Sequence, residues 1–330
     1  MTHSTSGISA VIVGAGLMGR WHADAARRAG ATIVGVVDPD SGRAAALVRH
    51  FPRARVSGSL EEFLARGTAN AVHICTPAAS HTALALIALD AGCHTLVEKP
   101  IAEDAAAAER LLVAAANRSL VICPVHQFLF QRGTTMAIRQ LEKLGPLRQL
   151  EMTMCSAGAE ATPALSDAIA FEILPHVLAM SARLCRTPIT SGDWVCRRPA
   201  SGEFLVVGTV GDVGISARIS MRGRPPVNQL RLVAEGATIH ADLFHGFAII
   251  EHPGSSRAMK IARPFLFAAG LLAAATGNLF RRTLRAEPAY PGLRELVLQF
   301  YAAALGQGPN PIPFNETRAV MAVWDRLRHA

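Results

Sequence analysis

The sequence predicts a two-domain protein: an α/β domain with a doubly wound parallel sheet, then an α+β domain with a mostly antiparallel, open sheet flanked by helices. A chain of 330 residues is too long for one ordinary core. In roughly the first 120 residues, β-branched runs alternate with Ala-rich helical runs, as in a parallel sheet covered by helices on both faces. Beyond about residue 124, runs alternate apolar and polar residues between turn signals, which indicates an antiparallel sheet.

The first domain contains five apolar runs of strand type, and helical runs follow four of them. The expected strands are residues 8–14, 32–38, 71–77, 94–99 and 120–125. The expected helices are residues 18–30, 41–51, 80–92 and 102–118. Ser80 is a candidate cap of the third helix, and Gly92 is its stop signal.

The second domain begins with a helix and a strand and ends with two helices. Helices are expected at 133–145, about 172–184, 291–305 and 315–328, and strands at 147–158 and within 204–221, 228–244 and 247–252. Asn315 is a candidate cap of the last helix. We therefore expect domains at residues 1–123 and 124–330, with the last helix able to pack back on the first domain.

The composition narrows the range of partners. The formal net charge is +8, which suits a nucleic acid, an anionic lipid or an acidic small molecule, although a solvated Arg-rich surface is the favoured interpretation. Aromatic residues make up only 5%, which argues against a base-stacking nucleic-acid platform. The six cysteines form no CxxC pair and no zinc-ligand spacing, so no metal is expected. Reduced thiols and a polar N-terminus without signal-peptide features predict a cytoplasmic protein.

The most apolar run, residues 264–280, is short of a membrane span and contains Gly270, Gly277 and Asn278. A buried or interface helix is the favoured interpretation. The basic run 281–285 follows it, so peripheral contact with an anionic membrane is the alternative.

A GxGxxG motif joins the first expected strand to the first expected helix. Gly14 permits the tight turn, Gly16 lets the backbone approach a pyrophosphate, and Gly19 lets the helix pack on the strand. Leu17 and Met18 lie at the helix N-terminus, whose free N–H groups favour phosphate. The alternative is a glycine-rich turn without a ligand.

An acid ends the second strand of this predicted Rossmann domain. Asp38 follows Gly19 by 19 residues and can accept both hydroxyls of an adenosine ribose while repelling a 2′-phosphate. NAD is therefore expected rather than NADP, although Arg43 could soften this preference. The alternative role of Asp38 is that of a turn residue.

Two further segments complete a family resemblance. Residues 73–81 read HICTPAASH, and residues 91–102 read AGCHTLVEKPIA. With the glycine motif they resemble the Gfo/Idh/MocA oxidoreductases, in outline over the whole chain and strongly over residues 8–102. The resemblance implies a cis peptide bond before Pro100, and it does not fix the substrate.

Lys99 is the expected catalytic residue. It follows a strand whose carboxyl end faces the cofactor crevice, where burial would lower its pKa and let it exchange a proton with a substrate oxygen. The alternative is a surface lysine paired with Glu98, itself expected near the cofactor. The resemblance implies that Thr76 and Pro77 pass under the nicotinamide ribose and that His81 lies near the site.

The resemblance also implies a second acid/base motif. Glu172 and His176 have its four-residue spacing, which puts both on one helix face, although Glu replaces the family's usual Asp and the flanking glycines are missing. Pro175 is acceptable if the helix begins near Glu172. His176 would be the acid/base partner of Lys99, and Glu172 would orient it or bind substrate, whereas a core histidine and a helix N-terminal acid are the alternatives. His126 and Gln127 are expected to touch substrate.

The leading functional hypothesis is an NAD-dependent oxidoreductase acting on a secondary alcohol or ketone of a sugar, cyclitol or nucleotide-sugar. A redox-neutral enzyme that retains NAD and an imine reductase are enzymatic alternatives. A non-catalytic NAD-binding regulator or scaffold is an alternative from another class. The family resemblance also implies a homodimer or homotetramer.

Overall fold

The computed structural model describes residues 7–156, 162–254 and 256–329, which form two compact units. Unit 1 runs to His126 and regains Leu293–Met321, whereas unit 2 comprises Gln127–Gly292 and the chain from Ala322 onward. The sequence predicted one boundary after residue 123 and a return to the first domain only for the last helix, expected at 315–328, whereas the returning segment is Leu293–Met321. The polar N-terminus up to residue 6 and residues 157–158 of an expected strand lie outside the described residues.

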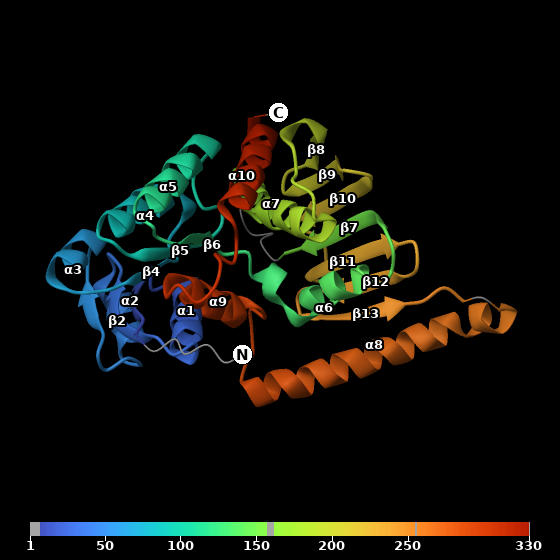
Figure 1. Cartoon of the computed structure of the whole chain (residues 1–330), viewed down its shortest axis with the longest axis horizontal. Coiled ribbons are helices and arrows are strands. Elements are labelled where there is room, and N and C mark those ends of the chain that lie inside the picture. Colours follow the sequence, from blue (N-terminus) through green and yellow to red (C-terminus); the bar gives the residue numbers. More distant parts are fainter. Residues whose placement is uncertain (1–6, 157–161, 255, 330) are drawn as a thin grey trace. The chain divides into compact units, whose positions relative to one another are not determined.

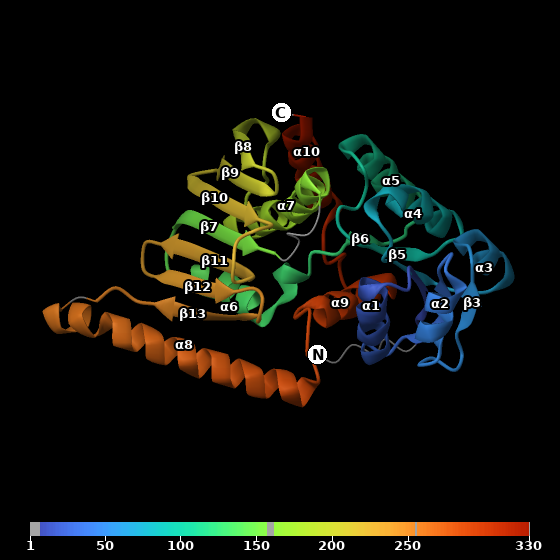
Figure 2. The ribbon, with the colours of Figure 1, turned by 180° about the vertical axis from the view of Figure 1, so that it is seen from behind.

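Unit 1 contains a six-stranded parallel sheet in the order β3-β2-β1-β4-β5-β6 (Figures 1 and 2). Its strands are β1 (Ser9–Val13), β2 (Thr32–Val37), β3 (Arg55–Ser57), β4 (Ala71–Ile74), β5 (His94–Val97) and β6 (Ile122–Pro124). The helices along it are α1 (Leu17–Arg28), α2 (Ser41–Val48), α3 (Leu60–Arg66), η1 (Ala78–Ser80), α4 (His81–Asp90) and α5 (Ala105–Asn117). The strand order reverses between β1 and β4, the switch point at which such sheets bind ligands. The predicted parallel sheet is thus confirmed.

Two features of unit 1 were not predicted: the elements β3 and α3, and the place in this unit of the helix that was predicted at 291–305. The strand β3 and the helix α3 are short, and the residues of β3 are exposed or half-buried, so they carry little apolar periodicity. The helix α9 (Leu293–Ala304) comes from the far end of the sequence and packs against α1. It adds Phe300 and Tyr301, both fully buried, to the core of unit 1.

Unit 2 contains a seven-stranded sheet in the order β13-β12-β11-β7-β10-β9-β8, in which only β7 and β10 pair in parallel. Its strands are β7 (Leu147–Cys155), β8 (Trp194–Ala200), β9 (Glu203–Val210), β10 (Val213–Ser220), β11 (Val227–Ala234), β12 (Thr238–Asp242) and β13 (Phe247–Glu251). The predicted, mostly antiparallel sheet is confirmed.

The sheet of unit 2 has one buried face and one exposed face. Along β10, Val213, Ile215, Ala217 and Ile219 are buried while the residues between them are exposed or half-buried. The helix α6 (Arg132–Leu141) packs on β12 and β13, and α7 (Pro163–Cys185) packs on β7, β9 and β10. The short helix η2 (Gln127–Phe130) contacts both α6 and α7, and η3 (Ser191–Asp193) precedes β8. The open face predicted from the alternating pattern is therefore present.

The helix α7 begins about nine residues earlier than the expected start near Glu172. Thr162 caps it by accepting a hydrogen bond from the Leu165 N–H, and Pro163 occupies the first turn, where its missing N–H costs nothing. The prediction of a start near Glu172 is therefore wrong, and Pro175 lies well inside the helix.

Two helices near the end of the chain, α8 (Arg257–Arg285) and α10 (Phe314–His329), also differ from the predictions. The apolar run 264–280 belongs to α8, which has no buried residue, so this run is not buried within the chain, and an interface helix stays a prediction. Figures 1 and 2 both show α8 beside the edge strand β13. The helix α10 already includes Asn315 in its first turn, so Asn315 is not its cap.

Candidate active site

The glycine loop joins β1 to α1 in a conformation that requires glycine. Gly14 has φ +93°, donates its N–H to Val37 O at 2.8 Å, and would place an added Cβ 2.8 Å from Cys75 O. An added Cβ at Gly19 would lie 1.8 Å from Gly14 O, so the helix packs directly on the loop. The sequence assigned these two roles correctly.

The start of α1 fits a phosphate group. Gly16 is the N-cap without a side-chain cap, and an added Cβ there would meet nothing within 4 Å. The first turn has no acidic residue; Leu17 is exposed, and Met18 is half-buried. The unpaired N–H groups of the first turn and the helix dipole favour an anion at this end, and no side chain fills the space beside Gly16.

Asp38 lies at the carboxyl end of β2 and holds the glycine loop. One carboxylate oxygen accepts the Ala15 N–H at 2.7 Å, and the other accepts the Asp40 N–H at 2.9 Å. Each carboxylate oxygen can accept a second hydrogen bond, so a ribose hydroxyl remains compatible. Arg43 is engaged nearby by Asp40, with Nε at 2.9 Å from Oδ2, and the Arg43 backbone N–H and guanidinium lower the pKa of the Asp40 carboxyl.

The segment after β4 and the segment after β5 are tied together by His81. Its Nδ1 lies 2.7 Å from Pro100 O, and its Nε2 lies 2.8 Å from Thr76 O. Ser80 donates its hydroxyl to Thr76 Oγ1 at 2.7 Å and to Pro77 O at 2.8 Å. His81 is buried, so its ring nitrogens join the two segments, a role that the expected proximity to the site did not include.

Lys99 follows β5 between a buried acid and a cis peptide bond. The Lys99–Pro100 bond is cis, as the resemblance implied. Lys99 is half-buried, and its backbone N–H donates to Glu98 Oε2 at 3.3 Å. Burial alone would raise the pKa of Glu98, but the His22 hydrogen bond and the charges of His22 and Lys99 outweigh it and lower this pKa. Glu98 is therefore an ionised partner beside Lys99.

Behind Glu98 runs a buried chain of hydrogen-bonding side chains that the sequence analysis missed. His22 Nε2 lies 3.1 Å from Glu98 Oε1, His22 Nδ1 lies 3.1 Å from His73 Nδ1, and His73 Nε2 lies 2.8 Å from Tyr301 Oη. Each of the four residues is at most 8% exposed. The one local signal in the sequence was His73, a polar residue within the apolar run 71–77. Its partner Tyr301 comes from the distant helix α9.

Two arrangements of protons fit the contacts of this chain. Burial raises the pKa of Tyr301 well above its usual value and lowers the pKa of His73 well below its usual value, with the charge of His22 adding to the latter shift. With His22 charged, its Nε2–H donates to Glu98, its Nδ1–H donates to His73 Nδ1, and His73 Nε2–H donates to Tyr301 Oη. With His22 neutral, Tyr301 O–H donates to His73 Nε2 and His73 Nδ1–H donates to His22 Nδ1, while His22 Nε2–H still donates to Glu98. In both arrangements His22 donates to the carboxylate beside Lys99.

In unit 2, α7 carries the acid and histidine of the second predicted motif. Glu172 is half-buried and His176 is buried, one turn apart on the same helix face. The His176 ring lies 4.6 Å, centroid to centroid, from Phe128. The motif is therefore a mid-helix feature and not a helix start.

Pro175 lies inside α7 because a side chain replaces its missing N–H. An alanine at position 175 would donate its N–H to Phe171 O, four residues earlier. In the structure Trp324 Nε1 donates to Phe171 O at 3.0 Å instead. Trp324 therefore supplies the hydrogen bond that Pro175 removes from the turn of α7 that carries Glu172 and His176.

The two remaining candidates lie at the boundary of the units. His126 ends unit 1 and is 3% exposed, whereas Gln127 begins unit 2 and is 8% exposed. The side-chain oxygen of Gln127 has no hydrogen-bond partner among the described residues. A buried amide oxygen of this kind suits a ligand hydroxyl or N–H group. No group of three metal-ligating residues was found within residues 7–156, 162–254 and 256–329.

Comparison with known families gives one match, to residues 8–126. They match the family GFO_IDH_MocA, described as an oxidoreductase family with an NAD-binding Rossmann fold. A UDP-N-acetylglucosamine 3-dehydrogenase of Acidithiobacillus ferrooxidans is 31% identical over 48% of this chain and 56% of its own length. An inositol 2-dehydrogenase of Leifsonia xyli subsp. xyli is 42% identical over 30% of each chain. The chain thus spans about half or less of the length of these curated relatives.

Solved structures share the fold over nearly the whole chain. A structure of the Acidithiobacillus ferrooxidans enzyme superposes with a TM-score of 0.76 at 21% identity and covers 98% of this chain and 97% of its own. The WlbA dehydrogenase of Bordetella pertussis, in complex with NADH and UDP-GlcNAcA, gives 0.76 at 16% identity over 98% and 96%. Similarity at this level of identity establishes the fold of both units and leaves the substrate open.

Proposed function

The chain belongs to the Gfo/Idh/MocA oxidoreductase family through residues 8–126, and from this premise we propose that it is an NAD-dependent dehydrogenase. Its substrate is a sugar, cyclitol or nucleotide-sugar that carries a secondary alcohol or the corresponding ketone. One observation carries the proposal: unit 1 places the glycine loop, Asp38 and Lys99 at the carboxyl ends of β1, β2 and β5. That edge is where doubly wound sheets bind dinucleotides.

The residues of this edge fit NAD. The uncapped start of α1 and the open space at Gly16 suit the pyrophosphate. Asp38 suits two ribose hydroxyls, whereas its charge disfavours the phosphate of NADP. Arg43 does not offset that charge, because Asp40 engages its guanidinium. Bound NAD supplies the hydride acceptor or donor.

The proton that accompanies hydride transfer is assigned to Lys99, with His176 as its partner. An ammonium group donates to a carbonyl oxygen, and an amine accepts a proton from an alcohol. Glu98 is the anion beside Lys99, and the Tyr301–His73–His22 chain holds its carboxylate in place. Glu172 and Gln127 supply polar groups suited to substrate hydroxyls.

The substrate class follows from the relatives and from the polar candidates. The similar proteins are named for UDP-N-acetylglucosamine and inositol, which are both hydroxyl-rich rings.

The open face of the unit 2 sheet carries exposed Val195, Leu205 and Val207, which suits a homo-oligomer. Free thiols at all six cysteines suit a cytoplasmic location.

The central test compares two lysine variants. We expect Lys99→Ala to bind NAD as the wild type does, by titration of protein fluorescence, while hydride transfer to NAD falls by about 10²–10⁴-fold. UDP-N-acetylglucosamine and inositol are the first substrates to assay, at 340 nm absorbance. Lys143→Ala is the matched control, because Lys143 is exposed at the end of α6. Unchanged activity in Lys99→Ala would contradict the assignment, and no NAD binding by the wild type would overturn the proposed function.

A further inference from the structure

The helix α8 is the largest feature of the chain that the proposed function does not use. It runs from Arg257 to Arg285 with no buried residue. Its middle, residues 264–280, holds 17 residues without a charge. A helix of this composition exposed to water would lose the hydrophobic stabilisation that its side chains can provide. Some apolar environment outside unit 2 must therefore cover it.

The large apolar side chains of α8 form one outward stripe. Ile261, Phe265, Leu272 and Leu279 follow one another at spacings of four, seven and seven residues, which places them on one side of a helix, and each is 68–76% exposed. The opposite side, which includes Phe267 and Asn278, is half-buried against unit 2. The exposed stripe is thus continuous along most of the helix.

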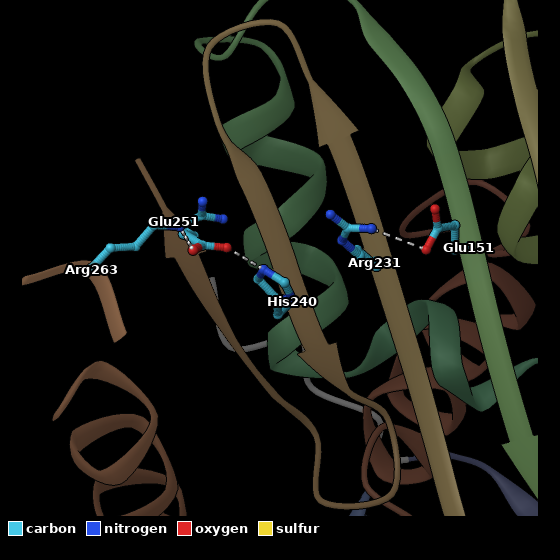
Figure 3. A network of polar contacts seen from close by, with 5 residues as sticks. All are labelled: Glu151, Arg231, His240, Glu251 and Arg263. Atoms are coloured by element: carbon cyan, nitrogen blue, oxygen red, sulfur yellow. Dashed lines mark hydrogen bonds and ion pairs between the residues drawn. The ribbon is translucent and has the colours of Figure 1, made fainter. Parts of the chain in front are cut away.

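Both halves of α8 are fastened to unit 2. Near its start, Arg263 pairs with Glu251, which also binds His240 Nε2 at 2.8 Å (Figure 3). Near its end, Asn278 donates its side-chain N–H to His245 O at 2.9 Å. From residue 263 to 278 a helix rises about 22 Å, and from 245 to 251 a strand covers about 20 Å. The helix therefore runs antiparallel to β13 along the edge of the sheet.

This attachment excludes a membrane span for α8. The charge-free segment is about 25 Å long, shorter than the roughly 30 Å hydrocarbon core of a bilayer. Both ends are tied to the same strand edge, so the two ends cannot lie on opposite sides of a bilayer. A helix held in this way can only lie flat, with its outward stripe in the boundary layer.

The charges of α8 identify the kind of surface. The helix carries six cations and no acid: Arg257, Lys260, Arg263, Arg281, Arg282 and Arg285. Three lie before and three lie after the charge-free segment. Burial lowers the pKa of the Arg281 guanidinium, and the positive charges of Arg285 and Arg132 nearby lower it further. Cations at both ends of an apolar stripe complement anionic headgroups, which their long side chains can reach.

A second copy of this chain suits the stripe less well. A two-fold contact between two α8 helices would bring cations against cations, and α8 provides no acid to pair with them. Glu251, the acid beside the helix, already binds Arg263 and His240. We propose that α8 docks unit 2 flat on an anionic phospholipid surface, with Phe265, Leu272 and Leu279 inserted among the lipids.

Vesicle flotation of the full chain tests the proposal. We expect the wild type to float with vesicles of equimolar phosphatidylcholine and phosphatidylglycerol, and to bind pure phosphatidylcholine about tenfold or more weakly. The double variant Leu272→Glu, Leu279→Glu should lose binding about 100-fold, since two inserted side chains become charged. Both positions are about 70% exposed, so folding is unaffected. High salt should weaken wild-type binding to the mixed vesicles.

The matched control is Val113→Glu with Leu165→Glu, two exposed apolar residues of α5 and α7. It makes the same change in charge elsewhere and should float like the wild type. Failure of the wild type to float with the mixed vesicles would overturn the proposal. Equal loss in the control would also overturn it. Light scattering without lipid gives the oligomer mass of the wild type and of the α8 variant. If the wild type does not float and the α8 variant has a lower oligomer mass than the wild type, the stripe contacts a second copy of the chain instead of lipid.

Discussion

Two long helices of unit 2, α7 and α8, have nearly the same apolar character and different surroundings. Both are long and apolar enough to cross a membrane by length and composition, with equal mean hydropathy. In α7, 61% of the most apolar window is buried, whereas in α8 none of it is. Hydropathy along the chain therefore does not decide burial. What decides it is whether other elements of the fold cover the helix.

The largest expected contrast comes from the same substitution in each helix. Leu178 of α7 is fully buried, and Leu272 of α8 is 70% exposed. Leu178→Ala should lower the free energy of unfolding by about 2–5 kcal/mol, because it leaves a cavity. Leu272→Ala should change it by less than about 0.5 kcal/mol. Urea denaturation measures both, and equal losses would show that α8 is covered in the isolated protein.

The second expected effect concerns the proline inside α7. Trp324→Phe removes the N–H that binds Phe171 O and should cost about 1–3 kcal/mol of unfolding free energy. In a Pro175→Ala background, the new backbone N–H can bind the same carbonyl, so Trp324→Phe should cost about 1 kcal/mol less. A double-mutant cycle by urea denaturation measures this coupling.

Trp194 provides the control for that cycle. It is 2% exposed, and its Nε1 has no hydrogen-bond partner among the described residues. Trp194→Phe should therefore show no coupling to Pro175→Ala. If Trp324→Phe costs the same in both backgrounds, its indole does not replace the missing N–H.

The third expected effect is the pH dependence of stability, which buried titrating groups cause and exposed positions do not. The folded pKa of His73 lies well below 6.5, so its contribution to stability is complete above pH 6.5 and is lost as the pH falls below it. Burial lowers the pKa of His94 and adds a loss in the same direction. The Glu98 contribution is present above its ordinary value of 4.5 and is lost only as the pH falls through its lower, folded pKa.

Between pH 6.5 and 4.5 we therefore expect stability to fall with pH, by up to about 1.4 kcal/mol per unit for His73. Denaturation at several pH values should give a smaller slope for His73→Gln than for the wild type. Leu272→Ala, on exposed α8, should keep the wild-type slope. A His73→Gln slope equal to that of the wild type would contradict the buried, neutral state of His73.

The smallest expected effect is the loss of the ion pair that fastens α8. Arg263 is exposed and binds Glu251 at the surface, where water and salt screen the pair. Arg263→Gln should leave the thermal midpoint of unit 2 nearly unchanged, because Asn278 and Arg282 still bind His245 O. Calorimetry at low and high salt measures the change. A large loss would mean that this pair, and not the packing along β13, holds the helix.

Much of the candidate site could be predicted from local sequence. Gly14 and Gly19 are required by contacts within a strand–turn–helix unit, and Asp38 and Lys99 follow strands whose ends a parallel sheet brings to one edge. The Tyr301–His73–His22–Glu98 chain could not be predicted. It joins residues separated by up to 228 positions, and no local pattern records which buried polar groups will meet.

The sequence alone therefore determined the two sheets, the glycine loop and the edge that carries Lys99, because these depend on local periodicity and backbone geometry. Only the tertiary structure decided the start and the tolerated proline of α7, the buried chain behind Glu98 and the exposure of α8. Each of these depends on which distant residues cover or bind a segment. The indole of Trp324 reaches the Phe171 carbonyl across 153 positions, and among the described residues none buries α8.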